Sequence, residues 1–139
     1  MSVVVDASVW VSAADTGDSY SAASRAFLAS LARKRTPIVL PANAHLEVAC
    51  AMARRLRNAR AARAIADELL RSPQITTAPL DAAFLTEAVD AGTSTYLRAG
   101  DALYVAAARR ARGELVSWDA ELVDRGGAIT PEAWLKRDA

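Results

Sequence analysis

The feature that most constrains this chain is the run of three valines at residues 3–5, which is followed at once by Asp6. β-Branched side chains suit a pleated sheet, and an apolar run without polar alternation is typical of a strand covered on both faces. Such strands belong to parallel sheets, which bind ligands at the edge where their strands end. Asp6 is therefore part of a site if other acids reach that edge, and otherwise a turn residue or helix cap.

The rest of the chain alternates short apolar runs with longer segments of helical period. We expect further strands at 37–41, 75–77 and 114–117, with a brief one near 128–130. We expect helices at 8–14, 19–34, 42–57, 58–71, 80–91 and 100–112 and from 131 onward, with 92–95 as a polar loop. This alternation predicts a three-layer α/β/α fold, in which a central, mainly parallel sheet carries helices on both faces.

Three local features refine these expectations. Ser19 is a candidate cap for the second helix, and Gly113 is placed to end the helix at 100–112 in a left-handed conformation. In the helix at 42–57, an apolar stripe of helical period is expected to face the core, and Cys50 on it to be inert. The stripe consists of Leu46, Ala49, Cys50, Ala53 and Leu56.

Length and composition narrow the class of protein. The 139 residues predict a single domain spanning 1–139. A net charge of +1 indicates no general affinity for nucleic acid, and one cysteine excludes an internal disulfide framework and fits a reducing compartment. The sequence contains no apolar run near the ~20 residues of a membrane span and no secretory signal. We therefore expect a cytoplasmic protein that does not contact a membrane.

Four acids fall where such a fold would bring them together. Asp6 and Asp119 follow predicted strands, whereas Glu47 and Asp101 lie early in predicted helices. Strand ends and helix starts share one edge of a parallel α/β sheet. Two carboxylates ~4 Å apart repel by roughly 4 kcal/mol at an effective dielectric near 20, and no Lys or Arg is evident inside the cluster. Oxygen ligands suit Mg²⁺ or Mn²⁺, which predicts metal-assisted phosphodiester hydrolysis.

The motifs around these acids resemble those of PIN-domain ribonucleases, and within them VapC-type toxins. The motifs are Val-Val-Val-Asp6-Ala-Ser8-Val, Pro41-Ala-Asn-Ala-His-Leu-Glu47-Val, Asp101-Ala-Leu-Tyr104-Val-Ala-Ala and Leu-Val-Ser117-Trp-Asp119-Ala-Glu-Leu, with the closing Ile129-Thr-Pro-Glu-Ala-Trp134. Ser117 stands where threonine is common, and Trp118 is bulky for a position beside the last acid.

The resemblance implies a divalent-metal-dependent endoribonuclease. Asp6, Glu47, Asp101 and Asp119 would form its catalytic, metal-binding quartet, with Mg²⁺ as cofactor and Mn²⁺ as a substitute. Ser8 and Ser117 would be supporting hydroxyls. The resemblance also implies a toxin that is silenced by a cognate antitoxin, and a homodimer. Glu121 and Asp124 are alternatives to Asp119.

Arginines between Glu47 and Asp67 suggest a path for RNA. Arg54, two helical turns after Glu47, could hold a phosphate, as could Arg60 and Arg63. Alternatively, Arg60 and Arg63 belong to a solvated helix face. Trp118 could stack on a base, although a packing role is favoured. His45 has no second histidine or cysteine at ligand spacing, so a surface or packing role is favoured for it.

Other functional classes fit less well. A non-catalytic RNA- or protein-binding module on the same fold is the main alternative, and a missing acid would have favoured it. A phosphorylated receiver domain would need a lysine after a late strand, whereas the two lysines are Lys34 and Lys136. A phosphatase of the haloacid-dehalogenase type would need a second aspartate where Ser8 stands.

Overall fold

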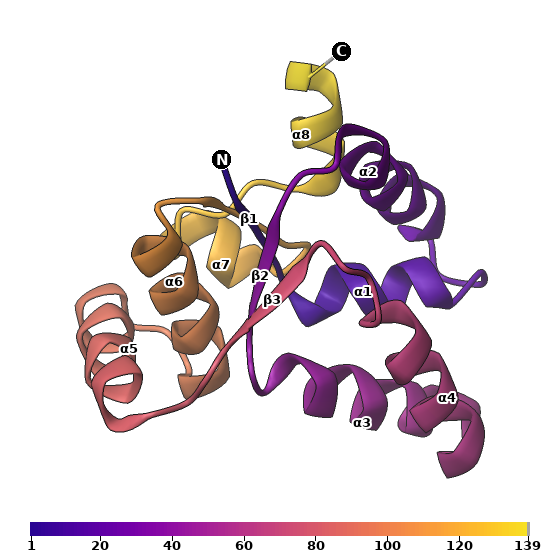
Figure 1. Cartoon of the computed structure of the whole chain (residues 1–139), viewed down its shortest axis with the longest axis horizontal. Coiled ribbons are helices and arrows are strands. Elements are labelled where there is room, and N and C mark those ends of the chain that lie inside the picture. The colour runs from indigo at the N-terminus through magenta and orange to yellow at the C-terminus, as the bar shows by residue number, and fades with distance from the viewer. Residues whose placement is uncertain (139) are drawn as a thin grey trace.

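The computed structural model describes residues 1–138 and arranges them as a sheet between two layers of helices (Figure 1). Within these residues the sheet contains β1 (Val3–Val5), β2 (Ile38–Pro41), β3 (Ile75–Ala78) and β4 (Glu114–Val116) in the order β3-β2-β1-β4, and every pairing is parallel. Val4 lies opposite Val39 on one side and Leu115 on the other. The predicted α/β/α architecture is confirmed, with β1 at its centre.

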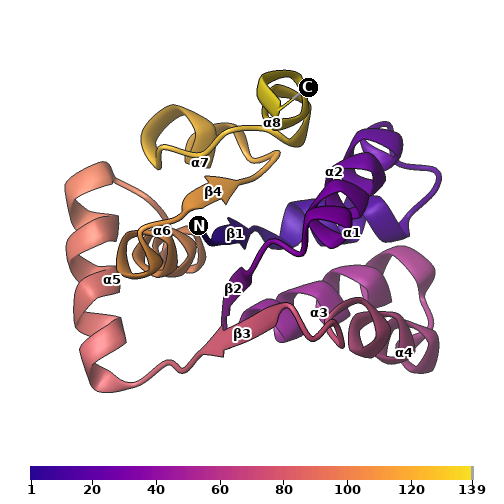
Figure 2. The ribbon, with the colours of Figure 1, turned by 45° about the horizontal axis from the view of Figure 1, so that its top comes forward.

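The helices cover the sheet from both sides (Figure 2). One side carries α1 (Ala7–Ala14), α2 (Ser21–Lys34), α3 (Ala44–Leu56) and α4 (Ala59–Leu69), and the other carries α5 (Ala82–Thr95) and α6 (Ala99–Ala111). α6 packs directly on β1, β2 and β4, and α5 packs on α6. α7 (Ala120–Arg125) and α8 (Pro131–Asp138) follow β4, and α8 packs against α2.

The core lies on both faces of β1, whose three valines are at most 2% exposed. Apolar side chains from both helical layers complete this core, among them Phe27, Val48 and Tyr104. Burial of such side chains is the main favourable term in folding, at roughly 1.5–3 kcal/mol each. No helix within residues 1–138 combines the length and the apolar character that crossing a bilayer requires.

The predicted loop at 92–95 is wrong, because α5 continues through Thr95 to the left-handed Tyr96. The polar residues bond back to the helix: Thr93 Oγ1 donates to Val89 O at 2.7 Å, and Ser94 Oγ donates to Asp90 O at 2.7 Å. Their hydroxyls thus join the helix instead of ending it. The brief strand predicted near 128–130 is reduced to one parallel bridge, between Val116 and Ile129.

Gly113 does not end its helix in the predicted way. Arg112 takes the left-handed conformation, with a φ of 51°, and Gly113 follows it. A Cβ on Gly113 would lie 2.4 Å from the carbonyl oxygen of Ser2, so glycine is needed here for close backbone approach. Ser19 does not cap α2, whose first turn follows Tyr20 without a side-chain cap.

The predicted core stripe of α3 is wrong in part, because Ala49 and Ala53 pack partly buried against the core but its other three residues are exposed. The buried residues of this helix are Ala44, Val48 and Met52, which recur every four residues. Leu46 is 63% exposed, and Leu56 and Cys50 are exposed as well. α3 packs against both α1 and α4, and these contacts select its buried side over the side that carries more apolar residues.

Candidate functional site

Asp6 lies at the junction of β1 and α1 and serves both elements. Its extended backbone ends the strand, and its Oδ2 accepts a hydrogen bond from the Ser8 backbone N–H at 3.3 Å, which caps α1. The same oxygen accepts a 2.8 Å bond from the hydroxyl of Ser117, which follows β4. Asp6 is buried, and this burial raises its pKa despite the opposing bonds from Ser8 and Ser117.

The two predicted serines join the ends of β1 and β4. Their hydroxyl oxygens lie 3.4 Å apart. Ser117 Oγ accepts from the backbone N–H of Asp119 at 2.9 Å, and Ser8 Oγ accepts from that of Trp118 at 3.1 Å. Because β1 and β4 are paired neighbours, these residues meet where the strands end. The structure thus brings Ser8 and Ser117 to Asp6.

Three carboxylates meet beside Asp6. Asp119 caps α7, because its Oδ1 accepts from the backbone N–H groups of Glu121 at 2.9 Å and Leu122 at 3.1 Å. Asp101 lies in the first turn of α6. One carboxylate oxygen from each of Asp101, Asp119 and Glu121 lies within 4.8 Å of the others. Glu121 therefore joins Asp119 in the cluster, whereas Asp124 is exposed on α7 and is not part of it.

The site also perturbs the ionisation of Asp101. Burial, followed by the charges of Asp119 and Asp6, raises the pKa of Asp101 to about 6. Its Oδ2 is buried without a hydrogen-bond partner within residues 1–138. A buried carboxylate oxygen that accepts no hydrogen bond is costly unless a cation or a proton compensates its charge.

Glu47 approaches from the other helical layer, in the first turn of α3. Its Oε1 accepts a 3.0 Å bond from Nδ2 of Asn43, one turn earlier. A Cβ built on Gly100 would lie 3.6 Å from Glu47 Oε2, so Glu47 lies against the start of α6. Burial, followed by the charges of Asp6 and Asp101, raises the pKa of Glu47.

Tyr104 lies one turn beyond Asp101 and is fully buried. Its hydroxyl has no hydrogen-bond partner in the described part of the chain. Burial and the nearby carboxylates of Glu47 and Asp6 raise the pKa of this phenol above its ordinary value, so Tyr104 is a neutral donor beside two acids.

Arg98 places a positive charge inside the acidic cluster, where none was expected. Its guanidinium nitrogens lie 3.7 Å from Asp101 Oδ2, 3.7 Å from Asp119 Oδ2 and 3.6 Å from Glu121 Oε2. The expectation that no arginine lies inside the cluster is therefore wrong. The Arg98 side chain is 75% exposed, so solvent screens these pairs and each contributes little to stability.

Sequence reasoning assigned no role to Arg98, Tyr104 or Asn43. Each has a spacing that could have indicated it: Arg98 is three residues before Asp101, Tyr104 is three after it, and Asn43 is four before Glu47. Residues three or four apart lie on the same side of a helix.

Two of the acids, Glu47 and Asp119, face a cavity of about 580 Å³. Its wall includes Ser8, Glu47 and Asp119 together with Arg54. Cys50 also lines it, so this cysteine faces the site instead of the core. Arg60 and Arg63 are exposed on α4 and do not line the cavity.

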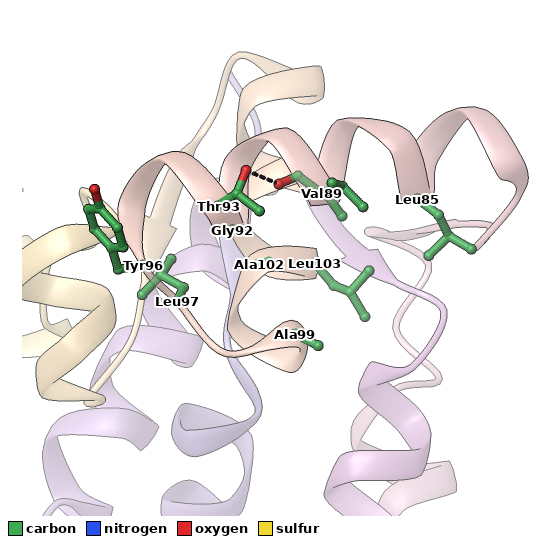
Figure 3. Close-up of a pocket in the computed structure, with 10 residues that line it drawn as sticks. Leu85, Val89, Gly92, Thr93, Tyr96, Leu97, Ala99, Ala102 and Leu103 are labelled. Carbon is green, nitrogen blue, oxygen red and sulfur yellow. Dashed lines mark hydrogen bonds between the residues drawn. The ribbon is translucent and has the colours of Figure 1, made fainter.

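A larger cavity of about 740 Å³ lies between α5 and α6 (Figure 3). Its wall is mostly apolar and includes Leu85, Val89 and Leu103. None of its lining residues carries a carboxylate with which to bind a cation, and none is basic. The smaller, acidic cavity therefore has the groups for chemistry.

The acidic site fits a hard divalent cation. Its donors are carboxylate and hydroxyl oxygens, which such ions prefer over softer ligands. Asp101 Oδ2 accepts no hydrogen bond within residues 1–138, and the pKa values of Asp6, Glu47 and Asp101 are raised, which indicates negative charge that the protein groups only partly compensate. His45, by contrast, pairs with Asp67 at 2.7 Å on the exposed surface.

Solved structures share this fold at low sequence identity. VapC20 from Mycobacterium tuberculosis, described as a sarcin–ricin loop cleaving toxin, superposes with a TM-score of 0.76 at 20% identity and covers 91% of this chain and 96% of its own. PAE2754 from Pyrobaculum aerophilum gives 0.72 at 22% identity, covering 99% and 94%. VapBC2 from Rickettsia felis, bound to a promoter DNA fragment, gives 0.70 at 14% identity, covering 94% and 97%.

Comparison of the sequence with protein-family models identifies the family of this chain. No curated protein sequence matches the chain significantly. The family model of the PIN domain, however, matches residues 3–127, which include Asp6, Glu47, Asp101 and Asp119. The resemblance noted in the sequence is thereby confirmed, and this chain belongs to the PIN domain family.

Proposed function

We propose that this protein is an endoribonuclease that hydrolyses RNA phosphodiester bonds with Mg²⁺, for which Mn²⁺ can substitute. The observation that carries the proposal is the meeting of Asp101, Asp119 and Glu121 beside Asp6 in a chain of the PIN domain family. Such a set of oxygen ligands, open to a cavity, suits a hydrolytic metal site.

Asp6, Asp101 and Asp119 would hold the ion, with Glu47 or Glu121 completing the acidic wall. When bound, the ion activates a water and neutralises charge that develops on the phosphate. Ser117 and Ser8 fix the carboxylate of Asp6 through their bonds to Oδ2, so that it does not reorient during the reaction.

The substrate would enter along α3. Arg54 lines the cavity wall that also carries Glu47, so it can hold a phosphate that leads toward the acids. Arg60 and Arg63 would act only on RNA long enough to reach the exposed face of α4. Phosphate contacts of this kind make affinity depend strongly on salt.

We extend the proposal to a toxin of a toxin–antitoxin pair. The structural likeness to VapC20, to the VapBC2 assembly and to a toxin–antitoxin complex from Klebsiella pneumoniae supports this role. A cognate antitoxin would silence the nuclease, and two copies of the toxin would associate as a homodimer in the cytoplasm. The RNA and the antitoxin are then the two macromolecular partners of the same acidic edge.

RNA-end sequencing after brief expression tests this function. Wild-type protein should produce an enriched set of new RNA ends within minutes, and Asp6→Asn and Asp101→Asn should not. Asp124→Asn is the matched control, because Asp124 is an exposed acid outside the cluster. Equal cleavage by wild type and Asp6→Asn would contradict the proposal.

One observation favours a second candidate, a non-catalytic binding module. Arg98 already lies close to three of the acids and could keep the cluster compensated without any metal. Calorimetric titration with Mn²⁺ separates the candidates, because the module would bind no ion at millimolar concentration.

A further inference from the structure

We propose that Tyr20 and Trp118 form a stacking surface for one unpaired RNA base beside the acidic cluster. This inference rests on the proposed nuclease function and names its substrate class, RNA with an unpaired nucleotide next to the cleaved bond. Both aromatic residues line the cavity that Glu47 and Asp119 also line.

The two rings already form a parallel stack. Their centroids are 4.0 Å apart, and their planes differ by 10°. Tyr20 is the outer member, at 48% exposed, whereas Trp118 is half-buried beneath it. Trp118 is anchored from below, because its Nε1 donates to Ser24 Oγ at 2.7 Å. Ser24 is buried and bonded in turn to Ser12 Oγ at 2.6 Å, so the surface is held rigidly.

Hydrogen bonds also fix the position of this stack relative to the acids. The backbone N–H of Trp118 donates to Ser8 Oγ at 3.1 Å, and Trp118 lies between Ser117 and Asp119 in the chain. Ser117 in turn donates to Asp6. A base on the stack would therefore place its own phosphate at a defined distance from the carboxylates.

The loop that carries Tyr20 is fastened to α3. Arg55 donates to Asp15 at 2.7 Å and to Asp18 at 2.9 Å, which compensates both acids. Asp18 also accepts from the backbone N–H of Tyr20 at 2.8 Å, and this bond, with Arg55, lowers the pKa of Asp18. Tyr20 is therefore held at the cavity by a charged anchor.

Arginines without ion-pair partners in the described part of the chain lie next to the Tyr20–Trp118 stack. Arg54 lines the same cavity, and Arg54, Arg55 and Arg57 line an adjoining one of about 460 Å³. Arg55 is occupied by Asp15 and Asp18, but Arg54 and Arg57 form no ion pair within residues 1–138. An aromatic face next to unpaired arginines is the combination that binds single-stranded nucleic acid, since every base offers a stacking face and every linkage a phosphate.

The charge pattern favours RNA over a protein segment as the occupant. Arg54 and Arg57, which form no ion pair within residues 1–138, attract phosphates and would repel a basic peptide segment. A base-paired nucleotide cannot present its face, because its neighbours in the helix cover it. The surface therefore selects loops, bulges or single strands.

Binding in EDTA tests the inference without cleavage. The probes are a labelled 12-residue oligoadenylate and its duplex with oligouridylate, followed by fluorescence anisotropy at low salt. Tyr20→Ala should weaken single-strand binding about tenfold, and Tyr20→Phe should stay within twofold of wild type. Tyr96→Ala is the matched control, because Tyr96 is 81% exposed at the end of α5, and it should have no effect. Duplex binding should be insensitive to every variant.

Unchanged single-strand binding by folded Tyr20→Ala would overturn the inference, as would equal losses for single strand and duplex. A variant that keeps RNA binding but escapes a co-purified antitoxin would assign the surface to a protein partner, and would overturn it too. The proposed nuclease function is tested independently of the stacking surface. If wild-type protein binds RNA through Tyr20 but never cleaves it with Mg²⁺ or Mn²⁺, the stacking surface stands and the nuclease function is wrong.

Discussion

The hydroxyl of Ser117 joins two acids of the site, because it donates to Asp6 Oδ2 at 2.8 Å and accepts from the Asp119 backbone N–H at 2.9 Å. A serine hydroxyl has one proton and two lone pairs, so a single side chain can satisfy both groups. The geometry of the end of β1 is thereby tied to that of the start of α7.

Ser117→Ala should lower both stability and activity. The substitution leaves the buried Asp6 carboxylate with one donor fewer and the Asp119 N–H without its acceptor, at about 1–3 kcal/mol in unfolding free energy. Loss of a group that orients a metal ligand typically lowers activity 10–100-fold. Urea unfolding and RNA cleavage rates measure the two effects. Ser117→Thr keeps the hydroxyl and should restore most of the activity, whereas equal losses in both variants would show that the hydroxyl is not what matters.

Asp101→Asn should change the stability of the fold in opposite directions with and without metal. In EDTA, removal of a buried charge that the site disfavours should raise the unfolding free energy by roughly 1–2 kcal/mol. With Mg²⁺, the variant should lose the stabilisation that the ion gives to wild type. Thermal melts with EDTA and with Mg²⁺ provide the comparison, and Asp124→Asn should change neither. An Asp101→Asn protein that melts at a lower temperature than wild type in EDTA would show that the Asp101 charge does not destabilise the metal-free fold.

The metal-free protein should become less stable as pH rises from about 4 to above 6. The raised pKa of Asp101, about 6 against an ordinary 3.8, means that the folded state retains a proton that the unfolded state has already released. Stability then falls as pH rises through this window, and Asp6 and Glu47 shift in the same direction. Urea unfolding in EDTA at several pH values measures the slope. The slope should be smaller in Asp101→Asn, and an equal slope in both proteins would assign it to other groups.

Arg98→Ala should tighten metal binding. The guanidinium of Arg98 lies 3.6–3.7 Å from carboxylate oxygens of Asp101, Asp119 and Glu121, so an incoming ion competes with it. Exposed pairs contribute roughly 0.2–1 kcal/mol each, so the loss of three predicts a rise in Mn²⁺ affinity of at least about threefold by calorimetry. Arg33→Ala is the charge-matched control, because Arg33 precedes β2 at the opposite edge of the sheet. Weaker Mn²⁺ binding by Arg98→Ala would mean that Arg98 supports the ion instead of competing with it.

The sequence predicts the position of a site residue correctly where that position follows from the strand or helix that carries it. The valine run predicts β1 and with it the position of Asp6, and the strand at 114–117 does the same for Asp119. Parallel pairing of β1 with β4 then brings these two acids to one edge. The convergence of acids was predictable for that reason.

Features that depend on packing between helices were not predictable from the pattern. The buried side of α3 is chosen by its contacts with α1 and α4, which overrode the stripe that contains Leu46 and Cys50. The long side chain of Arg98 reaches across to α7, a contact that no spacing along the chain encodes. Glycine is required at position 113 because the carbonyl of Ser2 lies against it, and not because it ends the helix as predicted. Ser2 is distant in sequence, so no local pattern indicates this contact.

Cleavage of a defined RNA by purified protein tests the central claim most directly. The substrate should carry a single-stranded loop with a 2′-deoxy nucleotide at the mapped cut site, which blocks nucleases that use the 2′-hydroxyl as nucleophile. A metal-dependent acidic site predicts cleavage by wild type with Mg²⁺ or Mn²⁺, none with EDTA, restoration when the metal is returned, and none by Asp6→Asn under any condition. Cleavage that survives EDTA, or that Asp6→Asn performs at the wild-type rate, would contradict the assignment of a metal-dependent acidic site.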